Sequence, residues 1–595
     1  MNFKASLKLM IVIISLTVSQ LHGQSTDWTG TNGSNFFNSN NWTNGVPQQG
    51  VNVGFNLPGE FFVSILADAE AGNVNISGGG EPNFIGDGEF VGLTFSIVDC
   101  DMSLSGDVTA VEGFLVGDIT GTDETTLFVE NGACVEVLGS MQIQGDSDVA
   151  FVGTDLDAEI LNIGHGAEAG FGRFDVVDDA RLDTNIVRIG QNASANYTVN
   201  LAGSSSWGNT GIMIVGDLGT GKLNVCQGSC VNTDSFVIAA RNPSGRGEIR
   251  IKDFGTEFVA SGNMLIGEDA PSTLEVSNDG LLQVDDLTIA SGSTATFDSG
   301  LAEMAGDINV NNSFLILENG SSLEVSGIVT IDNGSLTINS SDLQVDEVVN
   351  DGFLTTEGTD VVTLENVTNM GNMVIDTDTQ VMDLRNDTVI AINSDEGLTV
   401  NGDCIATGIF TGAGTVTLLG ETFIGSGNQP QDFSVEGTLQ LRSNSVVNMR
   451  VSSPVSDRIV CGEINIASNS LPTLDLEINN QGNFQDGQEI VLIETDQDIP
   501  EEFANLPEGH TEQVGEFTFT ATYSGGDGND LTLIVSGDDE VLLGDINLDG
   551  VVNLLDVGPF VDIITSGDFQ AEADINEDGE VNLLDVGPFV SILAG

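Results

Sequence analysis

Most of the chain between about residue 95 and residue 430 consists of short stretches in which apolar and polar residues alternate. Gly, Asn and Asp residues separate these stretches, as in TLEVSNDGLLQVDDLTIASGSTATF at 273–297. Successive side chains of a β-strand point to opposite faces, so alternation bounded by turn residues predicts strand, turn and strand again. The same region has no amphipathic pattern long enough for a helix of about ten residues.

The predicted strands recur with a marker, which is an apolar residue followed by Gly. The marker pairs are Val116-Gly117, Ile163-Gly164, Ile189-Gly190, Val215-Gly216 and Ile266-Gly267, with Ile238-Ala239 and Ile289-Ala290 as degenerate versions. From Gly164 onward the markers are 23–28 residues apart. This period is that of one coil of a β-solenoid, in which stacked coils bury a core that no single coil has.

The sequence therefore predicts an all-β fold, a right-handed parallel β-helix over residues 96–430. A β-sandwich array or a propeller is the alternative, but the blade-length repeat of about 40 residues that a propeller needs is missing. Two flanking regions are predicted to cap the rod. Residues 24–95 form the N-terminal β cap, and residues 431–537, which carry longer strands, form the C-terminal one.

The N-terminal cap contains an aromatic-rich segment, WTGTNGSNFFNSNNWTNGVP, at 28–47. A solenoid needs apolar side chains over the open end of its core, and these aromatic rings are expected to serve that purpose. Stacking on a sugar is the alternative. The residues concerned are Trp28, Phe36, Phe37 and Trp42.

Residues 538–595 contain one calcium-loop frame twice. The frame D-x-N-x-D-G-x-x-N-x-x-D begins at Asp545 and again, 29 residues later, at Asp574. Calcium takes about six to eight oxygen ligands, which a twelve-residue loop presents from positions 1, 3, 5, 7, 9 and 12, with Gly at position 6 for the sharp turn. The expected ligands of about two Ca²⁺ ions are Asp545, Asn547, Asp549, the Val551 carbonyl, Asn553 and Asp556 in the first loop, and Asp574, Asn576, Asp578, the Glu580 carbonyl, Asn582 and Asp585 in the second.

Three features distinguish these loops from a helix-loop-helix EF-hand. Position 12 is Asp rather than Glu, the residues before each loop are poor helix formers, and the loop is duplicated in tandem. In these features residues 538–595 resemble a type I dockerin. The resemblance implies a small α-helical domain that attaches a secreted protein to a protein partner, either a cohesin-like protein or another surface protein.

The segment also departs from the dockerin pattern. Loop positions 10 and 11, which are polar in many dockerins, are Leu554-Leu555 and Leu583-Leu584. Gly558-Pro559 and Gly587-Pro588 follow, so each helix is predicted to be kinked there or to begin at the Pro. The Leu pairs, together with Phe560 and Phe589, are expected to form either the module's own core or an apolar docking face.

The coils themselves resemble a known repeat. The segment IVGDLGTGKLNVCQGSCVNTDSFVIA at 214–239 is similar to the repeats associated with autotransporter passengers and PEP-CTERM proteins. The resemblance extends over about residues 160–290. It implies a β-solenoid that is located outside the cell.

Charge narrows the classes of partner. The chain has 14 Lys and Arg against 90 Asp and Glu, a formal net charge of -76. We expect neither nucleic acid nor an anionic membrane surface as a partner, because both attract cations, whereas an acidic surface attracts divalent metal ions. Residues 1–23 have a basic start, a short apolar run and small residues, which predicts a signal peptide, with a single-helix anchor as the alternative. We expect a secreted, extracellular or cell-surface protein with no membrane span in the mature chain.

The six cysteines add little to this picture. Cys226 and Cys230 are four residues apart, close enough for a disulfide across a turn, and the others are too scattered for their pairing to be predicted. A zinc site is not expected, because neither a second Cys pair nor a His pair accompanies them.

Catalytic motifs are scarce. Adjacent carboxylates such as Asp178-Asp179 and Asp285-Asp286 are expected to point to opposite faces of a strand and so not to act as an acid–base pair. Only His165 and His510 follow the predicted signal peptide, and the chain has no nucleophile elbow, metal-binding His motif or phosphate loop. The leading hypothesis is a non-enzymatic, calcium-binding structural or adhesive protein. The alternative is a polysaccharide-binding component of an extracellular complex, or a polysaccharide-degrading one (an O-glycosyl hydrolase or a polysaccharide lyase).

Overall fold

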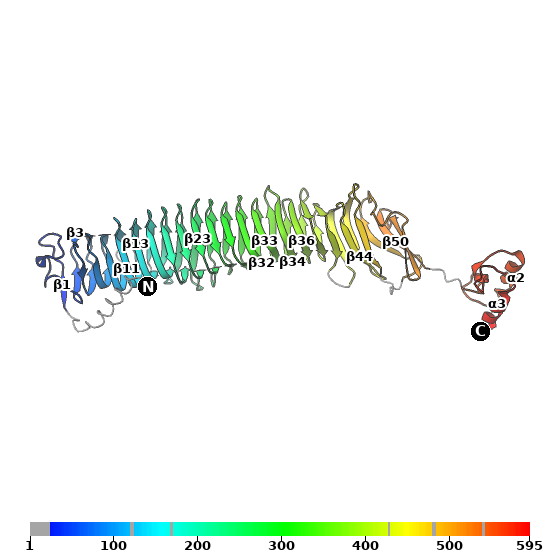
Figure 1. Cartoon of the computed structure of the whole chain (residues 1–595), viewed down its shortest axis with the longest axis horizontal. Coiled ribbons are helices and arrows are strands. Elements are labelled where there is room, and N and C mark those ends of the chain that lie inside the picture. The colour runs from blue at the N-terminus through cyan, green and yellow to red at the C-terminus, as the bar shows by residue number, and fades with distance from the viewer. Residues whose placement is uncertain are drawn as a thin grey trace.

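The computed structural model of the chain describes residues 24–118, 124–166, 170–425, 429–478, 484–537 and 542–594. Strands account for 56% of the structure and helices for 5%. The strands form a β-solenoid of about 19 turns, which is the long rod in Figure 1. The predicted all-β solenoid is therefore confirmed, while its right hand stays a prediction. The predicted signal peptide, 1–23, lies outside the described residues.

Each regular turn contributes three short strands, which pair in parallel with those of the neighbouring turns and so build three faces. Face one contains β16 (Asn196–Leu201), β19 (Thr220–Val225), β22 (Arg246–Lys252), β25 (Thr273–Ser277), β28 (Thr294–Asp298) and β31 (Phe314–Glu318). Face two contains β17 (Ser206–Asn209), β20 (Cys230–Thr233), β23 (Glu257–Ala260), β26 (Leu281–Val284) and β29 (Leu301–Met304). Face three contains β18 (Met213–Val215), β21 (Val237–Ala239), β24 (Met264–Ile266), β27 (Leu287–Ile289) and β30 (Ile308–Asn311).

Two long strands show how the faces join. Strand β32 (Ser322–Asn339) pairs successively with β29, β30 and β31, so one strand lies on all three faces. It also pairs with β33 (Asp342–Glu357), and the register between them shifts only between Val325 and Ile328 and between Asp332 and Ser335. The corners of these turns are therefore local irregularities within a continuous strand, where the chain bends without losing its pairing.

The apolar-Gly markers lie at one corner, where face three ends. Val215 and Ile266 are the buried last residues of β18 and β24. Gly216 and Gly267, which follow them, have φ angles of 79° and 83°. A Cβ on Gly216 would lie 2.1 Å from the backbone oxygen of Arg246 in the next turn. Both the positive φ and this close approach of the next coil require Gly, which explains the marker.

One degenerate marker is displaced from its predicted position. Val215 pairs with Ala239, so Ala240, with a φ of 53°, takes the place of the marker Gly. The prediction of Ile238-Ala239 at this corner is wrong by one residue, because two successive alanines leave the register open to either choice. Ile289-Ala290 lies where it was predicted, since Ile266 pairs with Ile289.

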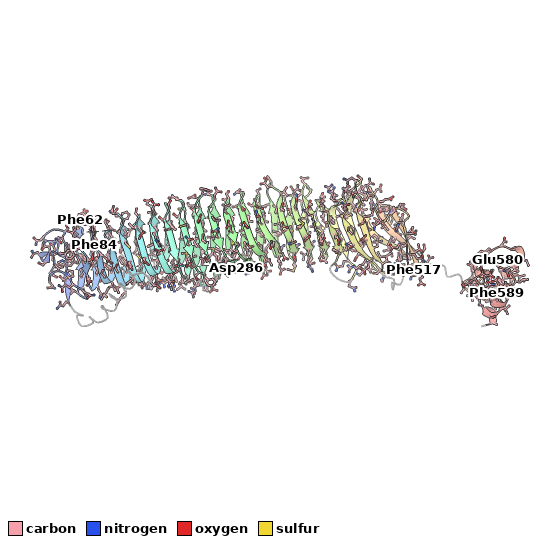
Figure 2. All side chains as sticks on the ribbon, in the orientation of Figure 1. Phe62, Phe84, Asp286, Phe517, Glu580 and Phe589 are labelled. Carbon is pink, nitrogen blue, oxygen red and sulfur yellow. The ribbon has the colours of Figure 1, made fainter. Side chains whose placement is uncertain are left out.

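The inward side chains form one hydrophobic core along the rod. On neighbouring strands near the N-terminal end, β3 (Gly59–Ser64) and β6 (Gly80–Ile85), Phe62 is exposed and Phe84 is buried (Figure 2). Each buried side chain of this size contributes about 1.5–3 kcal/mol, so the stacked turns supply most of the stability. One inward column on face one consists of Leu223, Ile249, Leu274, Ala295 and Leu315.

Three buried Asn side chains form a ladder inside this core. The Asn350 side-chain amide donates a hydrogen bond to Asn369 Oδ1 at 2.7 Å, and the Asn369 amide donates to Asn386 Oδ1 at 2.9 Å. All three residues are fully buried. Their polar atoms are tolerated because each has a partner in the neighbouring turn.

The N-terminal end of the rod is closed by aromatic side chains. Trp42 lies 5.0 Å from both Trp28 and Phe36, measured between ring centroids, and its indole N–H donates to the Phe36 carbonyl at 2.7 Å. Trp28 and Trp42 are only 2% and 5% exposed, whereas Phe37 is 39% exposed. The two buried indoles cover the core and are not accessible for stacking on a sugar. Parallel pairing already joins β1 (Ser25–Asp27) to β2 (Asn52–Phe55), so the solenoid ladder extends into region 24–95.

The C-terminal end of the rod is closed differently, by a change of strand direction. Strand β45 (Arg458–Ile466) still pairs in parallel with β47 (Glu489–Thr495). Strand β50 (Asp530–Gly537) then pairs antiparallel with β47 and with β49 (Phe517–Gly525). The antiparallel strands end the stacking of coils at this side of the rod.

Cys226 and Cys230 are not joined by the disulfide that their spacing allowed. Burial, followed by nearby carboxylates, raises the pKa of Cys100 and of Cys404 to about 12. Burial also raises the pKa of Cys461 to about 12.

Because the thiolate is the reactive form, we expect these three buried thiols to resist Ellman's reagent at pH 8 in the folded protein and to react in denaturant. The half-buried thiols of Cys134, Cys226 and Cys230 should react first. Mass spectrometry of alkylated peptides at several times would assign each rate. Equal, fast labelling of all six thiols in the folded protein would contradict the buried positions.

Candidate metal centre

The duplicated loops lie in a small C-terminal module with its own core. Its helices are α2 (Val557–Ser566) and α3 (Val586–Ala594), with a short 3-10 helix, η2 (Ala571–Ala573), between them. The Phe560 and Phe589 rings, one from each helix, are 4.2 Å apart between centroids and are buried. Ile546, Ala573 and Ile575 complete the core. No helix within the described residues is long and apolar enough to cross a bilayer.

The helices are not kinked at the Gly-Pro pairs. Helix α2 begins at Val557, so Pro559 lies in its first turn, and α3 has the same arrangement with Pro588. Backbone N–H groups of the first turn have no partner inside a helix, so Pro loses nothing there. The helix therefore starts directly after loop position 12, neither kinked nor delayed to the Pro as the sequence had suggested.

The first loop is held closed by hydrogen bonds from its own backbone. The Asp545 carboxylate accepts from the N–H groups of Asp549 at 3.1 Å and of Gly550 at 2.7 Å. The Asp556 carboxylate accepts from Asn547 N–H at 3.0 Å and from Asn553 N–H at 2.8 Å. Positions 1 and 12 of the frame therefore bind the two halves of the loop together.

The second loop repeats this geometry atom for atom. Asp574 accepts from Asp578 N–H at 3.1 Å and from Gly579 N–H at 2.8 Å. Asp585 accepts from the N–H groups of Asn576 at 3.0 Å and of Asn582 at 2.9 Å. Equivalent distances in the two loops differ by no more than 0.1 Å, so the sequence repeat is also a structural repeat.

Four carboxylates are buried in these loops without a cationic side chain nearby. Asp545, Asp556, Asp574 and Asp585 are all buried, and residues 542–594 contain 11 Asp and Glu but no Lys, Arg or His. Burial raises the pKa of Asp556, but hydrogen bonds from backbone N–H groups, first that of Asn553, outweigh it and the net shift is downward. Buried charges are normally paired with an opposite charge or with a metal ion, and within residues 542–594 these carboxylates have backbone N–H partners but no cationic side chain.

The donor types in each loop fit calcium. Carboxylate and amide oxygens at positions 1, 3, 5, 9 and 12, with a backbone carbonyl at position 7, are the hard oxygen ligands that Ca²⁺ prefers. In this structure, however, the carboxylates of positions 1 and 12 accept hydrogen bonds from N–H groups of the loop itself. Within the described residues, no three Asp, Glu, His or Cys side chains lie close enough together to hold a metal ion. An ion would therefore draw on the Asn oxygens and the Val551 or Glu580 carbonyl as well as on carboxylates.

The carboxylate pairs considered for catalysis lie in turns between strands or at corners of the rod. Asp178 and Asp179 have φ angles of 59° and 65° and lie between β14 (Phe171–Val177) and β15 (Arg181–Ile189), so the expectation that they sit on a strand is wrong. Asp286 lies at the corner before β27, where its Oδ1 accepts from Asp307 N–H at 2.8 Å. These side chains shape corners of the rod.

The Leu pairs lie outside the core of the module, on its surface. Leu554 and Leu555 are 80% and 69% exposed, and Leu583 and Leu584 are 77% and 68% exposed. The sequence left open whether they belong to the core, because loop positions 10 and 11 lie before the helix and have no regular periodicity to say which side is covered. Comparison with known proteins adds no family, since no protein-family model and no curated protein matches this chain.

Proposed function

We propose that this protein is an exported, calcium-binding β-solenoid rod of the cell surface or extracellular matrix, structural or adhesive in role. Its C-terminal module attaches the rod to a protein partner. The observation that carries the proposal is the exposure of the same two Leu residues in both loops. We call Leu554, Leu555, Leu583 and Leu584 the Leu face.

Exposed apolar side chains at equivalent positions of a repeat favour a binding surface. A single exposed Leu is ordinary, whereas contiguous apolar surface on a small soluble domain marks an interaction site. Val561 and Val590, on the helix that follows each loop, are also exposed, at 51% and 56%. Burying this surface against a partner would contribute roughly 25 cal/mol per Å² before the costs of association.

The charge of the module defines the partner's chemistry. The Leu face lies on a module with 11 carboxylates and no basic side chain. We infer a partner with an apolar pocket surrounded by Lys and Arg, because complementary charge speeds association and disfavours acidic competitors. A cohesin-like protein and another surface protein are both compatible with this description.

Calcium has a structural role in this proposal. The ligands would be Asp545, Asn547, Asp549, Val551, Asn553 and Asp556 in the first loop, and their equivalents 29 residues later in the second. The Leu residues lie at positions 10 and 11 of each loop, and each helix starts directly after position 12, so whatever holds the loop also holds its Leu pair and the start of the helix. Calcium would supply the positive charge that the buried carboxylates lack.

A variant of the full chain with all four Leu residues changed to Ser tests attachment. We expect wild-type protein in calcium to retain a saturable partner from the extracellular fraction of its own organism, and the variant to lose at least about tenfold in affinity, since each buried Leu contributes about 1.5–3 kcal/mol. Surface plasmon resonance with the retained protein measures the loss. Phe254→Ser, at a residue of the rod that is 85% exposed, is the matched control.

Two outcomes contradict the proposal. One is equal retention of the partner by the wild type and the four-Ser variant. The other is retention that persists unchanged when calcium is removed. Circular dichroism of the variant checks that its helices remain formed.

A further inference from the structure

Three cavities lie one after another along the rod, on the outer surface of face two. The first has a volume of about 330 Å³ and is lined by residues from the range 157–234. The second, of about 480 Å³, lies between residues 259 and 326, and the third, of about 310 Å³, between residues 361 and 417. We call these three cavities the cavity row.

Strand register shows that the cavities share one column of outward-pointing positions. In the first and second cavities, the paired positions in successive turns are Asp157, Asp183, Gly208, Asn232, Val259, Gln283, Glu303 and Glu324. In the third, Gln380 pairs with Thr399, and Thr399 with Thr417. The column is unbroken from Asp157 to Glu324 and continues to Gln344, and the third cavity lies further along the same face, so the cavities are parts of one elongated surface.

The row touches almost every turn over its length. It begins at β13 (Asp155–His165) and β15, and it ends at β36 (Thr379–Asn386), β38 (Gly397–Val400) and β41 (Thr415–Leu418). Between these ends only the turn of β33 contributes no lining residue. At a strand spacing of about 4.8 Å, the row is on the order of 60 Å long. Such a length suits a linear polymer rather than a small molecule.

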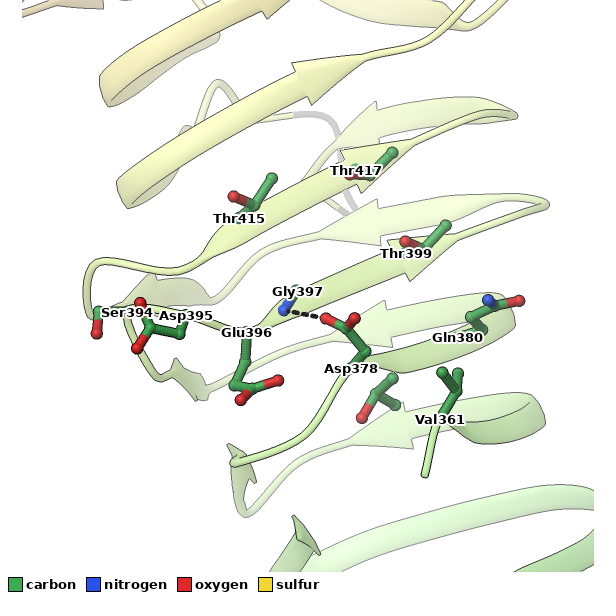
Figure 3. Close-up of a pocket in the computed structure, with 11 residues that line it drawn as sticks. Val361, Asp378, Gln380, Ser394, Asp395, Glu396, Gly397, Thr399, Thr415 and Thr417 are labelled. Carbon is green, nitrogen blue, oxygen red and sulfur yellow. Dashed lines mark hydrogen bonds between the residues drawn. The ribbon is translucent and has the colours of Figure 1, made fainter. Parts of the chain in front are cut away.

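The lining is rich in hydroxyl, amide and carboxylate groups. Figure 3 shows the third cavity, where Gln380, Thr399 and Thr417 lie on successive turns. Asp378 Oδ1 accepts from Gly397 N–H at 2.9 Å, which ties the cavity wall to the strand above it. In the second cavity the Gln283 side-chain amide donates to Glu303 at 2.7 Å and bridges two turns. These groups offer hydrogen-bond acceptors and donors at regular intervals.

Charge selects among polymers. The three cavities are lined by one cation, Arg181, which is 2.7 Å from Asp183. An anionic polymer would be repelled. Apolar side chains that could bury against a peptide gather in the second cavity and do not continue along the row. Sugar hydroxyls, in contrast, donate to carboxylates and amides without a charge penalty. The lining carboxylates are Asp157, Glu159, Asp183, Asp234, Asp285, Glu303, Glu324, Asp378, Asp395 and Glu396.

We propose that the cavity row binds a linear, neutral polysaccharide lying along face two. The turns present their polar side chains to successive sugar units of the same polymer. Many weak contacts then add up along one chain, as in any multivalent interaction. This binding site is independent of the C-terminal module, so the proposal goes beyond attachment to a protein partner and does not depend on it.

Affinity electrophoresis of the full chain tests the proposal. The gels contain a soluble neutral polysaccharide (mixed-linkage β-glucan, arabinoxylan, galactomannan or dextran) or an acidic one (alginate or polygalacturonate). We expect retardation by at least one neutral polymer and none by the acidic ones. Thr399→Trp and Gln283→Trp each fill one cavity with a side chain that strands accept, and each should raise the dissociation constant about tenfold.

Thr296→Trp provides the matched control. Thr296 points outward from β28 on face one, away from the row, and its substitution should leave the retardation unchanged within about twofold. Thermal unfolding of all three variants verifies that the rod is intact. Retardation by none of the neutral polymers, retardation only by the acidic ones, or equal retardation of all three variants and the wild type would each overturn the proposal.

Discussion

Removing calcium from the full chain should unfold the C-terminal module and leave the rod folded. The module's core is small, and four buried carboxylates remain without a counter-charge when no ion is bound. At free calcium a hundredfold above the dissociation constant, each site stabilises the folded form by about 2.7 kcal/mol. Because residues 542–594 contain no Lys or Arg, trypsin does not cut them, and a protease of broad specificity such as subtilisin is needed. We expect subtilisin to degrade residues 542–594 in EGTA while the solenoid resists. Mass spectrometry of the fragments locates the cleavage sites.

Paired variants distinguish ligands from ordinary acidic residues. Asp545→Ala with Asp574→Ala should abolish binding of about two calcium ions in isothermal titration calorimetry, because position 1 is lost from both loops. Asp562→Ala with Asp568→Ala removes the same charge from exposed positions outside the loops and should retain both ions. Titration of the wild type without a calcium signal, or protease resistance that is indifferent to EGTA, would remove calcium from the description of this module.

Opening the aromatic cap should destabilise the N-terminal end of the rod by about 3–5 kcal/mol in the variant Trp42→Ala. Trp42 contacts Trp28, Phe36 and Phe55 at ring-centroid distances of 5.0, 5.0 and 5.5 Å. Its removal leaves a cavity over the first turns and leaves the Phe36 carbonyl without the hydrogen bond from the indole N–H. Urea unfolding gives the size of the loss. Hydrogen exchange should show it concentrated in residues 25–85, because each turn of a solenoid contacts only its neighbours.

Phe37→Ala is the control for this effect. Phe37 is 39% exposed and packs against Phe36 from outside, so its loss should cost less than about 1 kcal/mol. A Trp42→Ala variant with wild-type stability, or exchange that increases evenly along the rod, would show that the aromatic cluster does not close the core.

The solenoid was predictable because its strands are short and its turns carry Gly. Alternation places every second side chain inside, and the marker Gly residues identify one corner of each turn. The prediction was wrong by one residue at 238–239, where Ala240 replaces the Gly and nothing in the local sequence distinguishes Ala239 from Ala240. It also misplaced Asp178 and Asp179 on a strand, because the chain turns there through residues other than Gly with positive φ.

The calcium loops were predicted as residue types and spacing, and the structure adds their hydrogen bonds. A frame in which Asp occupies positions 1, 5 and 12 with Gly at 6 is local, so the sequence alone carries it. Which loop atoms bond to which N–H groups depends on the fold of the whole loop. The Asp556 carboxylate, for example, accepts from the N–H of Asn547, nine residues earlier in the chain.

The sequence by itself determined the class of fold, the duplicated loops and the acidic surface, because each of these follows from local periodicity or composition. Tertiary structure alone decided that Phe560 and Phe589 fill the module's core while the Leu face stays exposed. It alone also aligned Gln380 with Thr399 and Thr417, and Gln283 with Glu303, on the outer surface of the rod. The reason is physical: local pattern tells whether a side chain points inward or outward, whereas its neighbours across turns depend on the register in which distant parts of the chain stack.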